Sequence, residues 1–515
     1  MLFNSFEFLV LFLPVSLGLF FGLGARSPRL AAAWLFGASL LFYGWWNPLY
    51  VGLLLGSILV NFSFGWVLSR PSERFGPGGR RAVLVLGLGA DLGLLGYYKY
   101  ANFFVDSLNG VFDLGWGLEP VLLPLGISFF TFTQIAFLVD AYRGEVREPR
   151  FIHYGLFVTY FPHLIAGPVL HHKEMMPQFA QPETYRIQWD NLSLGLTYFA
   201  FGLFKKLVLA DGIAPLATQV FSAAAAGATP SLFIAWGGAL AFGLQLYLDF
   251  SGYCDMAMGL SLLFGVRLPL NFNSPYQAVN IIDFWRRWHM TLSRFLRDYL
   301  YFPLGGNRRG VRRRYLNLLA TMLLGGLWHG AGWTFLLWGA LHGAYLMVNH
   351  AWLELRRMLG WGPGRSRLGR WAGRALTFLA VMVAWVPFRA PDLDTSWRLL
   401  GGMAGANGIQ IPEGVFLRLP AWASRILTDW GIQAGSWAGF DRTSWLWIGG
   451  LCLLVWLAPN SQQLLARFRP ALEPVTPSPW LGWRPNLWWM GAVAGLLFFA
   501  LTRMDRHSEF LYYQF

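Results

Sequence analysis

The stretch that organises this chain is YLNLLATMLLGGLWHGAGW, residues 315–333. Arginines precede it at Arg314 and follow at Arg356, so the apolar residues between them must enter a membrane and return. His329 lies 15 residues after Arg314, which is a depth of roughly 22 Å along a helix. The glycines around His329 break a helix and let a backbone or a ligand approach closely. The stretch therefore predicts a membrane hairpin that carries a histidine well inside the apolar layer.

The composition of the whole chain indicates a multi-pass helical membrane protein. Of the 515 residues, 55% are hydrophobic and only 13% are charged, whereas soluble domains carry about 25% charged residues. The mean hydropathy of +0.43 excludes a soluble enzyme and a disordered scaffold. Aromatic residues, which favour membrane–water interfaces, make up 17%. The two cysteines lie in apolar runs and cannot form a disulfide framework.

The basic residues mark loops of a membrane protein, and nucleic acid is excluded as a partner. The formal net charge is +14, but only four of the 40 basic residues are Lys, and the Arg residues gather between apolar segments. Such clusters are typical of cytoplasmic loops. Their alternation places both termini on the exported side and leaves the topology of residues 171–300 open. Acids and bases balance in the long loop 391–443, which we expect to be exported.

The apolar runs predict an all-α, polytopic membrane protein with about 11 to 13 membrane helices. We expect residues 1–350 to form the membrane core. Residues 351–515 add C-terminal helices, the exported loop and an aromatic tail. The first apolar run, residues 8–24, has no convincing cleavage site after it, so we expect a retained helix and not a signal peptide. We detect no internal repeat.

Ionisable residues at membrane depth are costly and are candidates for function. A neutral imidazole at His329 can accept a proton from a hydroxyl or a thiol; the alternative is a histidine that hydrogen-bonds neighbouring helices together. His289 lies at the edge of an aromatic stripe in residues 283–300, which predicts an interfacial or re-entrant amphipathic helix. There the alternative is a surface helix whose histidine marks the membrane boundary.

Three further polar features stand in apolar surroundings. Asp249 and Asp255 flank a Ser-Gly break and suggest a polar junction or a charge partner for arginines; the alternative is a buried ion pair or a helix-end contact. His163 lies in a broken helix, FPHLIAGP, of a kind tolerated only where it faces protein or a cavity. The adjacent His171 and His172 lack helical metal-ligand spacing, so we expect no metal.

The densest basic cluster can anchor a cytoplasmic loop or hold the phosphates of a nucleotide-like donor; it comprises Arg308, Arg309, Arg312, Arg313 and Arg314.

Together, the motifs resemble the membrane-bound O-acyltransferase family, specifically its bacterial alginate O-acetyltransferase branch. The blocks keep their order, spread over residues 1 to about 350, and are most specific at WRRWH and GLWHG. One departure is Cys254, where many relatives have Ser. The blocks are YKYANF (98–103), LPLGISF (123–129), FPHLIAGP (161–168), DFSGY (249–253), FWRRWH (284–289), RDYLY (297–301) and LGGLWHG (324–330).

The resemblance implies a fold with re-entrant or interfacial helices around a central tunnel in the bacterial inner membrane. His329, next to Trp328, corresponds to the family's catalytic histidine in that tunnel, and His289 to the second histidine-bearing motif. The donor substrate is expected to be cytoplasmic acetyl-CoA, with no bound cofactor. The acetyl group would cross the bilayer to an exported partner, an SGNH-type acetyltransferase, which modifies a polysaccharide such as alginate, cellulose or peptidoglycan.

The C-terminal sequence EFLYYQF (509–515) is similar to the terminal aromatic motif of this branch. We hypothesise that Tyr512 is an acyl relay, because phenoxide, with a pKa of about 10, is a good leaving group. The alternative is an aromatic anchor at the membrane interface.

The chemistry predicted is transfer of an acyl group from a thioester to a hydroxyl, with His329 as general base. A transporter or flippase of an acyl donor or glycan precursor is the main alternative. It would be expected to show paired half-repeats, and it does not require a histidine in a glycine-rich pocket. A scaffold for an export complex would fit the loop 391–443 but leaves His329 unexplained. The sequence does not identify the acceptor polymer or the oligomeric state.

Overall fold

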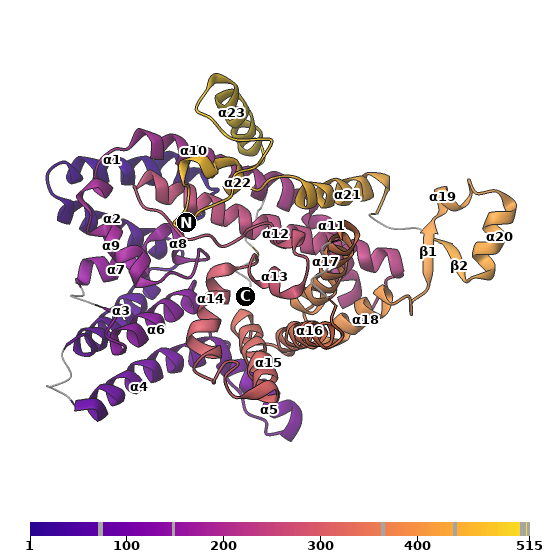
Figure 1. Cartoon of the computed structure of the whole chain (residues 1–515), viewed down its shortest axis with the longest axis horizontal. Helices are drawn as coiled ribbons and strands as arrows, with labels where there is room; N and C mark the ends of the chain where they lie inside the picture. Colours follow the sequence, from indigo (N-terminus) through magenta and orange to yellow (C-terminus); the bar gives the residue numbers. More distant parts are fainter. Residues whose placement is uncertain (71–75, 147–149, 362–365, 436–439, 505–510, 512–515) are drawn as a thin grey trace.

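The computed structural model describes residues 1–70, 76–146, 150–361, 366–435, 440–504 and 511. In these parts the regular secondary structure is almost all helical, as the sequence predicts, and the helices run in several directions and not in one parallel bundle (Figure 1). The two strands belong to a small unit at one end of the long axis (Figure 1).

The helices of the N-terminal half begin on the left side of Figure 1, in indigo and purple, and the later ones, in magenta, extend across its middle. They are α1 (Leu13–Gly24, preceded by the π-helical turn Glu7–Phe12), α2 (Pro28–Gly44), α3 (Leu49–Leu68), α4 (Gly76–Leu95, continued by the π-helical turn Gly96–Tyr100), α5 (Ala101–Phe112), α6 (Ile127–Tyr142), α7 (Phe151–Thr159), α8 (Phe161–Leu164), α9 (His172–Phe179), α10 (Trp189–Phe204, continued by the π-helical turn Lys205–Ala210), α11 (Asp211–Ala225) and α12 (Leu232–Leu263).

The helices of the C-terminal half complete the molecule. They are α13 (Ile281–Trp285), α14 (Met290–Leu296, continued by the π-helical turn Arg297–Tyr301), α15 (Gly310–His329), α16 (Trp333–Met358), α17 (Arg367–Arg389), α18 (Leu393–Met403), α19 (Glu413–Phe416), α20 (Ala421–Asp429), α21 (Arg442–Leu457), α22 (Ser461–Leu465) and α23 (Leu487–Leu501). Three 3₁₀ turns lie at Pro182–Tyr185, Pro275–Gln277 and Ala466–Phe468.

By length and composition, six helical segments in the described residues can cross a membrane, or seven if the pair α21–α22, bent by 45°, is one span. Six long apolar helices are compatible with the 11 to 13 membrane helices expected, because several apolar runs fold into shorter pieces. The apolar segment of residues 120–140 becomes helical only at Ile127, after Gly126, whose backbone lies in the left-handed region (φ 71°). The run near 152–170 breaks between α7 and α8.

The long helix α12 forms the centre of the core. Almost every residue from Gly237 to Leu263 is buried, so the helix is surrounded by protein on all its faces. It packs along α10, with Gly202 against Gly252 and Gly195 against Gly259; a Cβ at Gly202 would lie 2.5 Å from the Gly252 carbonyl oxygen. These glycines therefore set the distance between the two helices.

The loop 391–443 contains ordered elements that the sequence did not predict. After α18, strands β1 (Ile409–Pro412) and β2 (Ile432–Gly435) pair in parallel, joined by α19 and α20. Parallel neighbours need such a crossover connection. This βαβ unit projects away from the helical body (Figure 1) and exposes large apolar side chains, among them Leu417, Trp422 and Trp430.

Candidate functional site

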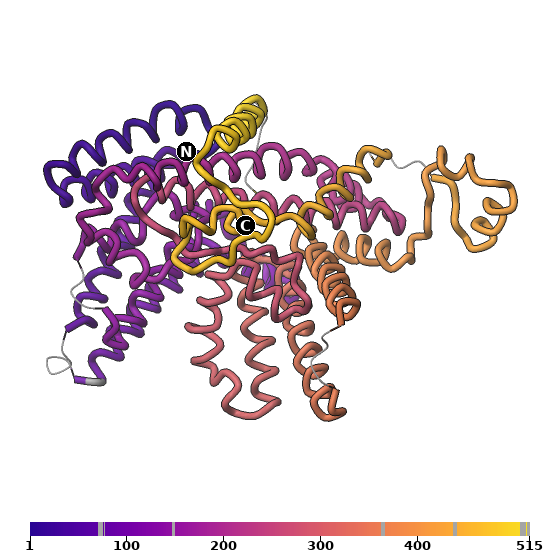
Figure 2. The backbone as a smooth tube through the Cα atoms, turned by 45° about the horizontal axis from the view of Figure 1, so that its top comes forward, coloured from indigo at the N-terminus to yellow at the C-terminus, as the bar shows by residue number. Residues whose placement is uncertain are grey.

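The site is built where α15 ends and α16 begins. α15 stops at His329, and Gly330 and Gly332 are extended (φ −158° and −169°) before α16 starts at Trp333. The two helices cross so closely at Gly326 that a Cβ there would overlap the Phe335 carbonyl oxygen. Figure 2 shows the two helices side by side. The helix break predicted at His329 is confirmed.

The His329 ring is enclosed by aromatic side chains and is only 3% exposed. The ring centroids of Trp328, Trp338 and Phe388 lie 4.9, 5.0 and 5.2 Å from it. Phe388 comes from α17, so three successive helices contribute to this aromatic box. An enclosure of this kind excludes water and strengthens any electrostatic interaction inside it.

His289 lies beside His329, with 6.4 Å between the ring centroids. The expectation of one amphipathic helix over 283–300 is wrong at this point. The chain breaks between α13 and α14, and His289 takes a left-handed conformation (φ 41°, ψ 55°) and is fully buried. A non-glycine residue held there costs on the order of 1–3 kcal/mol and persists only where its surroundings fix it.

Asn271 provides that fixation and sets the tautomer of His289. The Asn271 carbonyl accepts from the Met290 N–H at 2.9 Å. Its side-chain oxygen lies 3.0 Å from His289 Nδ1 and accepts from the Thr291 hydroxyl at 2.9 Å. Because that oxygen only accepts, His289 Nδ1 is the donor, and Nε2 carries the lone pair.

Lys99, which sequence reasoning did not select, holds the end of α15. Its ammonium group donates to the carbonyls of Trp328 (2.5 Å) and His329 (3.2 Å) and to the Ser128 hydroxyl (3.1 Å). The neighbouring Tyr100 hydroxyl donates to the Leu327 carbonyl at 2.9 Å. A cation at a helix C-terminus is favoured by the helix dipole. The signal available in the sequence was a lone lysine within the apolar helical segment Gly78–Phe112.

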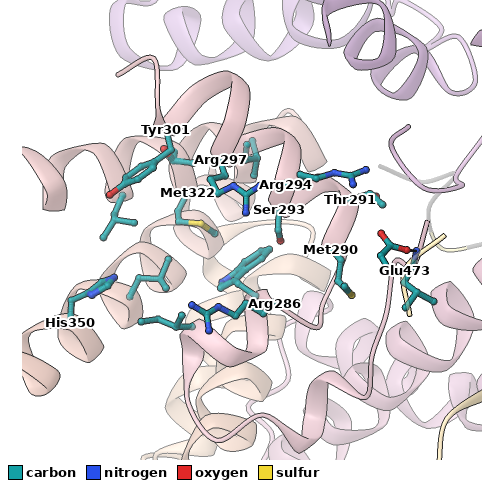
Figure 3. Close-up of a pocket in the computed structure, with 17 residues that line it drawn as sticks. Arg286, Met290, Thr291, Ser293, Arg294, Arg297, Tyr301, Met322, His350 and Glu473 are labelled. Carbon is teal, nitrogen blue, oxygen red and sulfur yellow. Dashed lines mark hydrogen bonds between the residues drawn. The ribbon is translucent and has the colours of Figure 1, made fainter. Parts of the chain in front are cut away.

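A pocket of about 560 Å³ opens between α13, α14, α15 and α16 (Figure 3). Arg286, Arg294 and Arg297 line it, and Glu473 lies at the edge beside Met290 and Thr291, across the pocket from His350 (Figure 3). Arg294 is held by a bidentate ion pair with Glu174, at 2.6 and 2.9 Å. Burial raises the pKa of the Glu473 carboxyl, which accepts from the Leu270 N–H at 2.8 Å.

The five arginines predicted to hold donor phosphates do not line this pocket. Arg308 and Arg309 are exposed in the turn before α15, and Arg312, Arg313 and Arg314 lie in its first turns. Their role in donor binding stays a prediction. The structure instead brings Arg286, Arg294 and Arg297 to the pocket. Arg286 belongs to the WRRWH block and Arg297 to the RDYLY block, which from the sequence alone served only as a family signature, and Arg294 lies between the two blocks.

A second pocket, of about 690 Å³, approaches the aromatic box from the N-terminal elements and residues 122–129. Ser128 lines it and also accepts from Lys99, and the Phe129 ring, also in its wall, lies 5.4 Å from Trp328. His329 lines neither of these two pockets.

The buried acids of α12 have lysines, and not arginines, as their partners. Asp249 pairs with Lys206, and Asp255 with Lys205, each at 2.7 Å. The buried ion pair is confirmed, but the expected arginine partner is wrong because the adjacent lysines of the π-helical turn after α10 face α12. Asp249 also accepts from the backbone N–H of Leu511 at 3.3 Å, so the C-terminal tail reaches the interior.

Two further predicted residues, His163 and His171, and Lys173, which follows His172 in the chain, make their contacts with residues other than His329. His163 Nε2 lies 3.0 Å from the Phe157 carbonyl, which the break between α7 and α8 leaves without a helical partner. His171 contacts Tyr299 at 3.1 Å, and burial lowers the pKa of His171. Lys173, on α9, pairs with Glu145. Tyr512 lies outside the described residues.

Comparison with known proteins gives one consistent result. A sequence model of the membrane-bound O-acyltransferase family matches residues 121–382. A peptidoglycan O-acetyltransferase of Helicobacter pylori is 42% identical over 438 residues, covering 80% of this chain and 81% of that protein. A probable alginate O-acetylase of Pseudomonas putida is 45% identical over 421 residues, covering 80% and 82%. A teichoic acid D-alanyltransferase of Streptococcus thermophilus is 27% identical over 292 residues, covering 53% and 69%.

Proposed function

The chain belongs to the membrane-bound O-acyltransferase family, and on this premise we propose that it moves an acetyl group from cytoplasmic acetyl-CoA across the inner membrane to an exported SGNH-type acetyltransferase. It is a multi-pass membrane O-acetyltransferase that acts in the acetylation of an exported polysaccharide. The observation that carries the proposed mechanism is the convergence of His329 and His289, 6.4 Å apart in a closed aromatic box between two pockets.

The reaction follows from the groups that the fold brings together. The donor's phosphates pair with the arginines of the pocket in Figure 3, which are suited to phosphate oxygens. The thioester reaches inward to His329. As general base, the imidazole takes the proton of the acceptor hydroxyl while the oxygen attacks the thioester carbonyl, and the thiolate then leaves. His289 presents its Nε2 lone pair as a second acceptor beside the reacting groups.

Tyr512 is proposed as the acceptor that carries the acetyl group outward. Leu511, next to it in the chain, is buried and donates to Asp249, whose neighbour Phe250 packs against the His289 ring at 4.9 Å. This contact supports a tail that reaches the site. A Tyr512→Phe variant is expected to keep donor binding and to lose acetylation of the polymer; full acetylation in this variant would rule out the relay.

The test of the function is the His329→Ala variant. It is expected to insert normally and to abolish acetylation of the exported polymer, because the imidazole proposed to take the hydroxyl proton is removed. The measurement is the acetyl mass shift of the polymer from cells with wild type or variant. Purified wild-type protein is expected to cleave the thioester of labelled acetyl-CoA in detergent. Because detergent leaves no closed compartment, this measurement detects chemistry and cannot detect transport. Wild-type polymer acetylation by His329→Ala would refute the mechanism.

A further inference from the structure

One face of α16 leads from the arginine-lined pocket to His329. Leu346 and His350 line that pocket, His342 lies one turn deeper, and Trp338 lies one turn deeper again. Side chains four residues apart lie one above another on a helix. The distance from His350 to Trp338 is roughly 18 Å along the helix axis, and the Trp338 ring is 5.0 Å from His329. This face joins the open pocket to the closed box.

His342 lies on this face and has no hydrogen-bond partner, at either ring nitrogen, in the part of the chain that the structure describes. It is fully buried. Aromatic rings surround it, with centroids at 4.8 Å for Trp338 and 5.2 Å for Trp285. The large majority of buried polar side-chain atoms are hydrogen-bonded, so two unpaired nitrogens on one buried ring require an explanation.

A ligand entering from the pocket would pass this imidazole. Trp285 forms part of the pocket wall and contacts His342 directly, so movement of the Trp285 ring would open the pocket onto His342. A neutral imidazole carries one N–H donor and one acceptor nitrogen. A secondary amide offers the complementary acceptor and donor. The position and the chemistry therefore fit the same ligand, an extended arm that contains amide groups.

We propose that His342 binds a secondary amide in the arm of the acyl donor, between the arginines that hold its phosphates and the thioester at His329. The proposal rests on the proposed function, because it takes a thioester donor in this pocket as given. It assigns to α16 a donor-binding residue that takes no part in the bond-making step. His342 fixes how far the arm extends, and so where the thioester carbonyl stops relative to His329.

The experiment measures equilibrium binding to the detergent-purified His329→Ala protein, which cannot turn the donor over. The probes are labelled acetyl-CoA and an analogue in which methylene groups replace the amides of the arm. Adding His342→Phe is expected to weaken acetyl-CoA binding about tenfold, the effect of losing one hydrogen bond while leaving its partner buried. Binding of the amide-free analogue should not change. His342→Gln, which keeps a donor and an acceptor, should restore most of the acetyl-CoA affinity.

The control is His153→Phe, a histidine on α7 outside the pocket, which should bind both probes as the parent does. Equal acetyl-CoA affinity with and without His342→Phe would overturn the inference, as would an equal loss for both probes. Replacing an unpaired buried polar ring should not lower the thermal midpoint of the donor-free protein. A marked fall with both His342→Phe and His342→Leu would assign His342 a structural role instead.

The same experiment separates this inference from the proposed function. If the His329→Ala protein binds no acetyl-CoA and wild type cleaves none, the donor assignment itself fails. If acetyl-CoA binds and is cleaved by wild type, but His342→Phe has no effect on affinity, only the role of His342 is overturned.

Discussion

Lys99 fixes the end of the helix that carries His329, the proposed general base. Its ammonium group bonds the last two carbonyls of α15, at Trp328 and His329, and so fixes where the helix stops. Without that cation, the carbonyls would lose their partner and the end of α15 would be free to rewind or shift. Displacement of a reacting group by about 1 Å can cost roughly a hundredfold in rate.

We therefore expect Lys99→Met to lower kcat for acetyl transfer roughly 10- to 100-fold with little change in KM for acetyl-CoA. Lys99→Arg, which keeps the cation and its donors, should recover part of the rate. The matched control is Lys173→Met, at an exposed lysine on α9, which should behave as wild type. A rise in KM alone, or a Lys99→Met enzyme as fast as the control, would argue against a positioning role.

The histidines of the site could be predicted from the sequence, and their partners could not. His329 and His289 lie in specific motifs, and the structure brings them together. Lys99 reaches a carbonyl 230 positions away, and Asn271 reaches His289 from 18 positions before it. Such contacts depend on how helices cross in three dimensions, which hydropathy and motif spacing do not encode.

At the scale of elements, the site is formed where helices break, at His289 and after His329. Apolar length predicted where the chain enters the membrane, and the FPHLIAGP block predicted the interruption that follows Tyr160, but neither located the interruptions at Gly126 and His289. Each interruption depends on a local close contact or an unusual backbone angle and not on average hydropathy. The segment 283–300 kept its amphipathic pattern and still broke, because Asn271 bonds satisfy the backbone and side chain at the turn.

The crossing of α15 and α16 gives a test at this scale. Gly326→Ala would place a Cβ against the Phe335 carbonyl oxygen, and we expect it to lower stability by about 1–3 kcal/mol. In an uncrowded helix, the same change would stabilise by roughly 0.5–1 kcal/mol. Gly332→Ala in the same hairpin meets its nearest atom at 3.5 Å and serves as the control. The measurement is the thermal midpoint in detergent; a Gly326→Ala midpoint at or above that of Gly332→Ala would contradict the packing.

At the scale of the whole molecule, buried ion pairs tie distant parts of the chain together. Asp255 on α12 bonds Lys205 after α10 and the Ser461 hydroxyl of α22, at 2.7 and 2.5 Å. Asp249, two turns earlier, joins Lys206 to the tail at Leu511. These contacts hold the C-terminal elements onto the core, an arrangement that the proposed division at residue 350 did not anticipate and that no apolar pattern indicates.

Removing one partner of such a pair should cost more than removing both. Lys205→Met leaves the fully buried Asp255 without its cation, and we expect a loss of about 3–5 kcal/mol. The double variant Lys205→Met/Asp255→Leu removes both charges and should regain most of that loss. Thermal unfolding of the purified proteins in one detergent compares them. Additive losses in the double variant would show that the pair is not coupled.

The scarcity of lysine has a practical consequence. Lys99, Lys205 and Lys206 are each engaged with carbonyls or carboxylates at the core, whereas the side chain of Lys173 is 56% exposed. An amine-reactive fluorophore applied to the folded protein would thus mark α9 in preference to the other lysines. Once the α-amino group of Met1 is blocked, this coupling site, beside Glu174 and the Arg294 that it holds, offers an optical reporter of ligand entry without a cysteine having to be introduced.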